Sequence, residues 1–208
     1  MRLVVVTKTH PVELVRAVVR AGAQHVGENY AEEGAAKKLA LGSPADIGWH
    51  MIGHVQSRKA ALVASHFDWV HSLDSLKLAE RFNRFASEQG RRIPVLLECN
   101  VSGEESKYGW QAWRGAEWGL LLDPLSQVLN LPAIEVRGLM TMAPFLPDPE
   151  QARPYFQRLK RLRDFLVDRL PGADWSELSM GMSADYEVAI EEGATWVRIG
   201  TAITGSRT

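Results

Sequence analysis

Residues 69–100 read WVHSLDSLKLAERFNRFASEQGRRIPVLLECN, with an apolar run at each end and a longer amphipathic segment between them. The runs 69–73 and 93–100 are short and rich in β-branched and apolar residues, which is typical of buried strands. In the segment 75–89, Leu, Ala and Phe side chains fall near one face at helical spacing. This stretch predicts a strand, a helix and a second strand parallel to the first, joined by a right-handed crossover.

The same alternation continues along the 208-residue chain. The predicted strands are residues 3–7, 25–29, 49–53, 69–73, 93–100, 136–142, 177–180 and 196–202. The predicted helices are residues 12–21, 30–41, 57–65, 75–89, 151–170 and 184–192, with an irregular helical region at 111–130. Eight strands alternating with helices in a chain of this length predict one α/β domain, residues 1–208, folded as a closed (β/α)8 TIM-like barrel. The alternative is an open doubly wound sheet, although its usual G-x-G-x-x-G fingerprint after the first strand is absent.

Composition restricts the partners and the location of the protein. The chain has 24 Lys and Arg against 25 Asp and Glu, a formal net charge of −1, and a single cysteine, Cys99. A balanced charge produces no field that would attract nucleic acid or an anionic membrane. One cysteine excludes an intrachain disulfide, and no apolar run reaches the roughly 18 residues of a membrane-spanning helix. We therefore expect a soluble cytoplasmic protein with no nucleic-acid or membrane partner.

Lys8 follows the first predicted strand, and in a barrel the chemistry lies where strands end and loops begin. Side chains alternate along a strand, so Val4, Val6 and Lys8 share one face. A partly desolvated amine in the barrel mouth loses some of its preference for the charged form and can attack a carbonyl group. The alternative is a lysine whose stem lies along the strand end while its amine stays in water.

Two turns rich in small residues surround the last two predicted strands. Residues 179–183, SMGMS, lead into a helix and place Ser183 near its N-cap. Gly200 and Thr201 end the last strand, where a glycine lets the backbone approach a ligand. Backbone N–H groups at a helix start bind anions, and barrels often hold phosphate in the loops after strands seven and eight. These turns are therefore candidate anion-binding residues.

Arg198 lies between Val197 and Ile199 in a strand that both layers of a barrel would bury. A buried guanidinium group needs an acceptor. That acceptor is either a ligand atom or one of the carboxylates Glu28, Glu98 and Glu135.

Other motifs for chemistry are missing. The chain has no complete phosphate loop and no G-x-S-x-G nucleophile elbow. His50 and His54, four residues apart on a strand, would lie too far from each other to share a metal ion. We expect no metal site, and we expect Cys99 to be a buried structural thiol.

Seven short motifs occur in an order typical of one family: TKTHP (7–11), GENY (27–30), WHMIG (49–53), QSRK (56–59), RGLM (137–140), SMGMSAD (179–185) and VRIGT (197–201). With them the chain resembles the pyridoxal phosphate homeostasis proteins, single-domain relatives of the N-terminal barrel of alanine racemases. The resemblance covers residues 3–205. It implies a (β/α)8 barrel that holds pyridoxal 5′-phosphate (PLP) as a Schiff base to Lys8.

The resemblance also assigns the remaining cofactor contacts. Asn29 would line the site, and Arg198 would approach the pyridine nitrogen. The phosphate would lie against the Met182-Ser183 turn and against Gly200-Thr201, with Ser179 nearby.

The family is regarded as a cofactor buffer with no catalytic residues, which implies a role in intracellular vitamin B6 homeostasis. A guanidinium group does not give up its proton to the pyridine nitrogen, so the ring is a weaker electron sink for a substrate carbanion. We also expect the β-domain that brings a second base to alanine racemases to be missing after the last strand. We expect a carrier, a monomer or weak homodimer, that passes PLP to apo forms of PLP-dependent enzymes. The alternatives are a small PLP-dependent amino-acid racemase or lyase, and a barrel that has lost its ligand.

The chain departs from the family pattern at Arg58, where Asn is usual, at His54, where a small residue or Pro is usual, and at its N-terminus. Family members have a helix before the first strand, and here only Met1 and Arg2 precede Leu3. We expect a bare apolar groove over the first and last strands, which a longer natural N-terminus or a neighbouring chain would cover. The side chains expected in this groove are Leu3, Val5, Thr7, Val197, Ile199 and Thr201.

Overall fold

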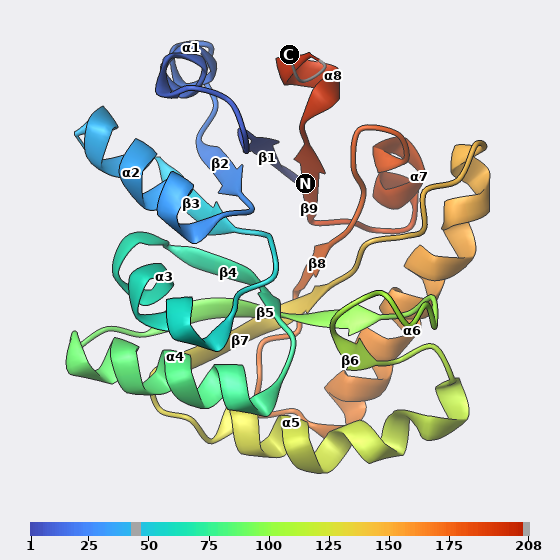
Figure 1. Cartoon of the computed structure of the whole chain (residues 1–208). Coiled ribbons are helices and arrows are strands. Elements are labelled where there is room, and N and C mark those ends of the chain that lie inside the picture. The colour runs from blue at the N-terminus through green and yellow to red at the C-terminus, as the bar shows by residue number, and fades with distance from the viewer. Residues whose placement is uncertain (43–46, 206–208) are drawn as a thin grey trace.

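Eight parallel strands close into a barrel in the computed structural model of the chain, which describes residues 1–42 and 47–205 (Figure 1). The strands are β1 (Arg2–Val6), β2 (His25–Glu28), β3 (Gly48–Met51), β4 (Trp69–Leu73), β5 (Ile93–Asn100), β7 (Ile134–Met140), β8 (Glu177–Ser179) and β9 (Trp196–Ile199). Strand β1 pairs with both β2 and β9, and β4 pairs with β5, so the ring is closed. The predicted (β/α)8 TIM-like barrel is confirmed, and the open doubly wound sheet is wrong.

Helices surround the barrel and alternate with the strands (Figure 1). They are α1 (Val12–Arg20), α2 (Ala31–Leu41), η1 (Ser57–Lys59), α3 (Ala60–His66), α4 (Leu76–Glu88), η2 (Gly115–Leu121), α5 (Leu122–Leu129), η3 (Pro149–Ala152), α6 (Arg153–Arg169), α7 (Tyr186–Glu191) and α8 (Thr201–Thr204). Ser75 is the N-cap of α4, and its hydroxyl accepts from the N–H of Leu78. None of the helices in the described residues is long and apolar enough to cross a membrane.

The region 111–130 is helical but irregular, as predicted, because it consists of a 3-10 helix, η2, followed by α5. Two local predictions were wrong. Gln111, predicted as the first residue of that helical region, belongs instead to the two-residue strand β6 (Trp110–Gln111), which pairs with the end of β5. Strand β9 was predicted to run to residue 202, but it ends at Ile199 and the chain turns at Gly200 into α8.

The bare groove expected over the first and last strands is not present in the described residues. Val5, Thr7, Val197 and Ile199 are each at most 6% exposed, whereas Leu3 is 38% exposed. Thr201 is exposed, but it begins α8 and does not extend β9. The apolar side chains among the buried four, Val5, Val197 and Ile199, belong to the hydrophobic core between the strands and the helices, which also contains the thiol of Cys99. Residues 206–208, part of the tail expected near this groove, lie outside the described residues.

The interior of the barrel is unusually polar. TIM barrels mostly fill this space with Val, Ile and Leu. Here His50, His71, Glu98, Ser179 and Arg198 are each at most 4% exposed. The hydrogen bond between His71 of β4 and Ser179 of β8 joins two strands that are not neighbours in the sheet, so it crosses the interior. Each buried polar group needs a hydrogen-bond partner inside the barrel, and this restricts the positions at which the strands can hold these side chains.

A buried ionic cluster ties β1 and β2 to α2 on the outside of the barrel. The Nζ atom of Lys37 donates to Glu28 Oε1 at 2.8 Å, to Glu33 Oε1 at 2.6 Å and to the carbonyl oxygen of Thr7 at 2.7 Å. Glu28 is fully buried and also accepts from the Thr7 hydroxyl at 2.6 Å. Burial raises the pKa of Glu28, and the bonds from Lys37 and Thr7 oppose that rise.

The same cluster holds the turn that carries Lys8. Glu33 Oε1 accepts from the backbone N–H of Thr9 at 2.6 Å. Thr9 has a φ of 64°, a left-handed conformation that is rare for a β-branched residue. Strained backbone of this kind persists only where its surroundings impose it. The Glu33 carboxylate, itself held by Lys37, therefore fixes the chain directly after Lys8.

We expect Lys37→Met to destabilise the protein by about 3–5 kcal/mol, because it leaves the Glu28 carboxylate buried without its partner. Urea unfolding at pH 7 measures the change. Lys38→Met is the matched control, since Lys38 pairs with the more exposed Asp68, and its expected cost is about 0–1 kcal/mol. Equal losses from the two substitutions would contradict this role of Lys37.

Candidate functional site

Four neighbouring strands bring the predicted site residues to one end of the barrel. The strand order β2-β1-β9-β8 places the carboxyl ends of these strands side by side. Lys8 follows β1 and Asn29 follows β2, and both are half-buried. The turns after β8 and β9 begin at Met180 and Gly200. Residues far apart in the sequence thus gather at the C-terminal mouth.

The two turns meet through one hydroxyl group. Ser183 Oγ accepts from the N–H of Gly200 at 3.2 Å and from the N–H of Ala202 at 3.4 Å. Ser183 lies two residues before the N-cap of the following helix, near it as predicted. Helix α7 begins later and its N-cap is Asp185, whose carboxylate turns back to accept from the Met182 N–H at 2.6 Å. The hydroxyl of Ser183 is therefore available to link the turns.

Gly181 is required where the first turn passes α7. Its φ is +92°, and a Cβ atom there would lie 2.6 Å from the Cβ of Ala189. The Gly181 carbonyl also accepts from the N–H of Arg198 at 3.0 Å. The turn is thus fixed against both its own helix and β9.

Arg198 is buried without a carboxylate partner. Its guanidinium donates to Ser179 Oγ at 2.6 Å and to the carbonyl oxygen of Thr141 at 2.9 Å. Within residues 1–42 and 47–205, no carboxylate forms an ion pair with it. Burial lowers the pKa of Arg198 to about 10, although Glu98 and Asp185 act in the opposite direction, so the group stays charged at neutral pH.

Two of the three carboxylates considered for Arg198 pair elsewhere. Glu28 pairs with Lys37, and Glu135 pairs with Arg137. The third, Glu98, attracts Arg198 electrostatically but forms no ion pair with it in the described residues, so the predicted structural ion pair at Arg198 is wrong. A guanidinium group has five N–H donors, so its bonds to Ser179 and Thr141 leave donors for a ligand atom.

Glu98 leaves a buried acceptor unused in the described residues. It is 4% exposed, and its Oε2 atom has no hydrogen-bond partner. Burial raises the pKa of Glu98 to about 7; the nearby Asp74 adds to the rise and Arg198 opposes it. Unpaired buried polar atoms are rare in folded proteins and often mark functional sites.

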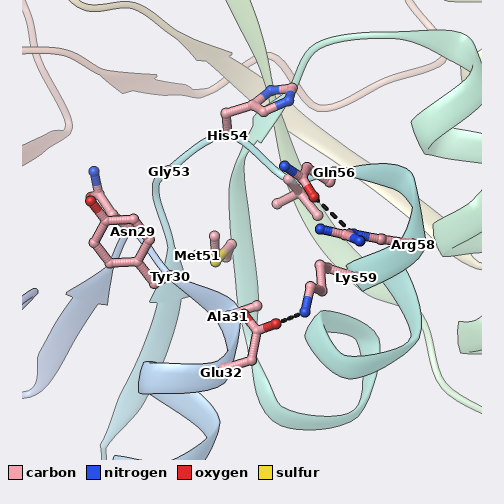
Figure 2. Close-up of a pocket in the computed structure, with 11 residues that line it drawn as sticks. Asn29, Tyr30, Ala31, Glu32, Met51, Gly53, His54, Gln56, Arg58 and Lys59 are labelled. Carbon is pink, nitrogen blue, oxygen red and sulfur yellow. Dashed lines mark hydrogen bonds and ion pairs between the residues drawn. The ribbon is translucent and has the colours of Figure 1, made fainter.

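An open cleft lies beside Asn29 (Figure 2). It has a volume of about 490 Å³. Asn29 and Tyr30 form one wall and His54 lies at the far rim, while Lys59 pairs with Glu32 on the floor side. Solvent and small molecules can therefore reach the mouth next to the end of β2.

Sequence reasoning missed His71, Thr141 and Asp185. Asp185 stands in the motif 179–185, but its bond to Met182 could not be deduced from the motif. Thr141 contributes only a backbone carbonyl, which no residue type signals. His71 occupies the third position of β4, as His50 does in β3, and this shared position in neighbouring strands was the one available signal. In the described residues, no three His, Cys, Asp or Glu side chains gather to hold a metal ion.

Glu98 makes stability depend on pH. Its carboxyl binds a proton more tightly in the folded state, with a pKa of about 7, than at its ordinary value of 4.5. That stabilisation is complete below pH 4.5 and is lost as the pH rises towards 7. Between pH 5 and pH 8 we expect wild type to lose about 2–3 kcal/mol relative to Glu98→Gln. Urea unfolding across this range, with exposed Glu80→Gln as control, measures it, and parallel pH curves for wild type and Glu98→Gln would contradict it.

Comparison with known proteins places the chain in a family. The model for the family described as "Alanine racemase, N-terminal domain" matches residues 1–208. A pyridoxal phosphate homeostasis protein of Vibrio alginolyticus is 42% identical over 100% of this chain and 87% of its own length. The protein of the same name from Escherichia coli K12 is 40% identical over 99% of this chain and 85% of its own length.

Solved structures agree with these sequence matches. PipY of Synechococcus elongatus, solved without PLP, is 37% identical with a TM-score of 0.91, over 99% of this chain and 93% of that one. PipY with PLP bound is 36% identical with a TM-score of 0.89, over 99% and 92%. The alanine racemase of Clostridium difficile, 15% identical with a TM-score of 0.76 over 100% of this chain and 53% of that one, shows a shared fold. The chain therefore belongs to the pyridoxal phosphate homeostasis protein family, which is built on the alanine racemase N-terminal barrel.

Proposed function

We propose that this protein binds PLP through Lys8 and holds it in reserve for other proteins, without turning over a substrate. The observation that carries the proposal is the convergence of three features at one barrel mouth. These are an amine after β1, two turns joined at Ser183 and Gly200, and the buried guanidinium of Arg198. Each feature matches one part of PLP: the aldehyde, the phosphate and the pyridine nitrogen.

The phosphate would lie between the two turns. The hydroxyl of Ser183, the backbone at Met182 and the backbone at Gly200-Thr201 are the groups that would face it. Hydrogen bonds from N–H groups to an anion are shorter and stronger than those to a neutral acceptor. Two turns already held together by a hydrogen bond present these groups without further ordering.

The cofactor would supply an aldehyde, which condenses with a lysine amine with loss of water. Lys8 would provide that amine, on a turn fixed by the bond between Thr9 and Glu33. Asn29, directly after the neighbouring strand β2, would line the same space, beside the open cleft. Both residues are half-buried, which suits a site that a small molecule enters from solvent.

The character of Arg198 favours storage over catalysis. Its guanidinium keeps its proton at neutral pH and would donate a hydrogen bond to the pyridine nitrogen. A ring that is hydrogen-bonded but not protonated withdraws electrons from a substrate carbon less strongly. The relatives of high identity are named homeostasis proteins, and the alanine racemases share only the fold.

We extend the proposal to the surroundings of the protein. It would act in the cytoplasm as a monomer or weak homodimer and would pass PLP to apo forms of PLP-dependent enzymes. Its balanced charge supports the absence of nucleic-acid and membrane partners.

Borohydride reduction after incubation with PLP, followed by peptide mapping, should place one pyridoxyl group on Lys8. The amine of Lys37 makes three hydrogen bonds in a buried cluster, and Lys59 pairs with Glu32. A label on either of these residues in place of Lys8 would contradict the assignment. Lys8→Ala is the control, and sustained racemisation of alanine that Lys8→Ala abolishes would establish an enzyme instead of a carrier.

Ser183→Ala should weaken PLP binding roughly ten- to hundredfold, the value of one hydrogen bond to a charged group. Adding Thr201→Ala should weaken it further. Pyridoxal, which lacks the phosphate, should bind wild type much more weakly than PLP does, and the double variant should narrow this difference. Titration followed by absorption measures all five affinities: wild type, Ser183→Ala and the double variant with PLP, and wild type and the double variant with pyridoxal. Equal binding of the two ligands by wild type would refute the phosphate site.

A further inference from the structure

A chain of hydrogen bonds runs through the barrel interior to Arg198. His25 Nδ1 lies 3.1 Å from His50 Nε2, and His50 Nδ1 lies 2.8 Å from His71 Nε2. His71 Nδ1 lies 2.9 Å from Ser179 Oγ, which accepts from Arg198 at 2.6 Å. His25 is the first residue of β2. The row of hydrogen bonds therefore begins near the N-terminal end of the barrel and reaches the candidate site.

The guanidinium group sets the direction of every bond in this chain. Guanidinium nitrogens only donate, so Ser179 Oγ must accept from Arg198 and can give its own single O–H to His71 Nδ1. His71 then carries its proton on Nε2 and donates to His50 Nδ1. His50 likewise donates from Nε2 to His25 Nδ1. All three imidazoles take the same tautomer.

The reverse direction is unfavourable. If His71 Nδ1 donated to Ser179, the Ser179 O–H would have no acceptor among the described residues. Ser179 is fully buried, and an unpaired buried hydroxyl costs the free energy of its lost solvation.

The electrostatics agree with three neutral rings. Burial lowers the pKa of His50 and of His71 well below the ordinary value, and for His71 the Arg198 charge is the next cause. Burial and the Arg2 charge lower the pKa of His25. An uncharged imidazole has one donor and one acceptor nitrogen, as each position in the chain requires.

Tryptophan rings hold the imidazoles in place. Trp69 stacks on His50 with 5.9 Å between ring centroids and an interplanar angle of 12°. The rings of Trp196 and His25 are nearly perpendicular with 4.8 Å between their centroids, and the Arg2 guanidinium carbon lies over the Trp196 ring, 3.9 Å from its centroid. Packing on several sides restricts rotation of the rings, so the ring nitrogen that faces each neighbour is structurally fixed.

We propose that His71, backed by His50 and His25, is a positioning residue for the PLP site. By accepting the Ser179 O–H at Nδ1, it fixes the orientation of the hydroxyl whose oxygen accepts from Arg198, and it thereby aims the guanidinium at the place of the pyridine nitrogen. The inference rests on the proposed function for the identity of the ligand. The order of the hydrogen bonds rests on the geometry alone.

The tautomers can be measured without PLP. Two-bond ¹⁵N–¹H NMR correlation of the wild-type protein at pH 7 should show His71, His50 and His25 each protonated on Nε2. Ser179→Ala removes the donor to His71 Nδ1 and should abolish the single-tautomer signal of His71. Protonation of His71 on Nδ1, or an imidazolium in the wild type, would overturn the proposal whatever the protein binds.

The effect on the site can be measured in the holoprotein. His71→Phe should weaken PLP binding about five- to tenfold and shift the absorption spectrum of bound PLP. His71→Asn retains an acceptor near Ser179, so its PLP affinity and its absorption spectrum should lie closer to those of wild type. His66→Phe, on the outer helix α3, is the control and should change neither.

The outcomes separate the two proposals. A wild-type spectrum and affinity in both His71 variants would overturn the positioning role. If His71→Phe does not fold, the His71→Asn spectrum and the wild-type tautomers still decide the matter. Failure of wild type to bind PLP would overturn the proposed function, whereas the tautomer measurement would still decide the order of the chain.

Discussion

The interior of this barrel is organised around one buried positive charge, on Arg198, that forms no ion pair in the described residues. A guanidinium group in a low-dielectric space needs acceptors on every side it presents, and each acceptor then needs a defined orientation. Arg198 obtains two of them, a serine hydroxyl and a backbone carbonyl, and its other N–H donors are left for a ligand. The need for a defined orientation passes from the Ser179 hydroxyl to the imidazole of His71, and from there to His50 and His25. A polar core of this kind allows few sequences, because each member fixes the protonation of the next.

The outer face of the same strands follows the opposite rule. There the buried carboxylate of Glu28 meets a full positive charge on Lys37, and the pair holds α2 against β1 and β2. The two arrangements lie on opposite sides of the sheet and serve adjacent strand ends, one at Lys8 and one at Arg198. The candidate site is therefore supported from inside the barrel and from outside it.

The parts of the structure that depend on local pattern could be predicted from the sequence. Alternating apolar and amphipathic segments identified the eight strands of the ring, and the parallel arrangement placed Lys8, Asn29, Ser183 and Gly200 at one mouth. The ends of helices and strands were harder to predict. Strand β9 ends before Gly200 because the Gly200 N–H bonds to Ser183 of the neighbouring turn, a contact between distant residues. The sequence placed Ser183 near a helix N-cap, but it did not identify Asp185 as the cap residue, whose carboxylate accepts from the Met182 N–H. The partner of His71 lies 108 positions away in the chain, and no spacing rule in the sequence could find it.

The hydroxyl bridge between the two turns has a thermodynamic consequence for the proposed role of a PLP carrier, which requires release of the cofactor. In the structure described here, the N–H groups of Gly200 and Ala202 already have an acceptor in Ser183. An arriving phosphate would exchange one acceptor for a better one, so the net gain in free energy would be the difference between two hydrogen bonds and not the whole of the new one. The same exchange would spare the empty protein from exposing unsatisfied donors after departure of the ligand. Moderate affinity and a stable ligand-free state would then share one structural cause.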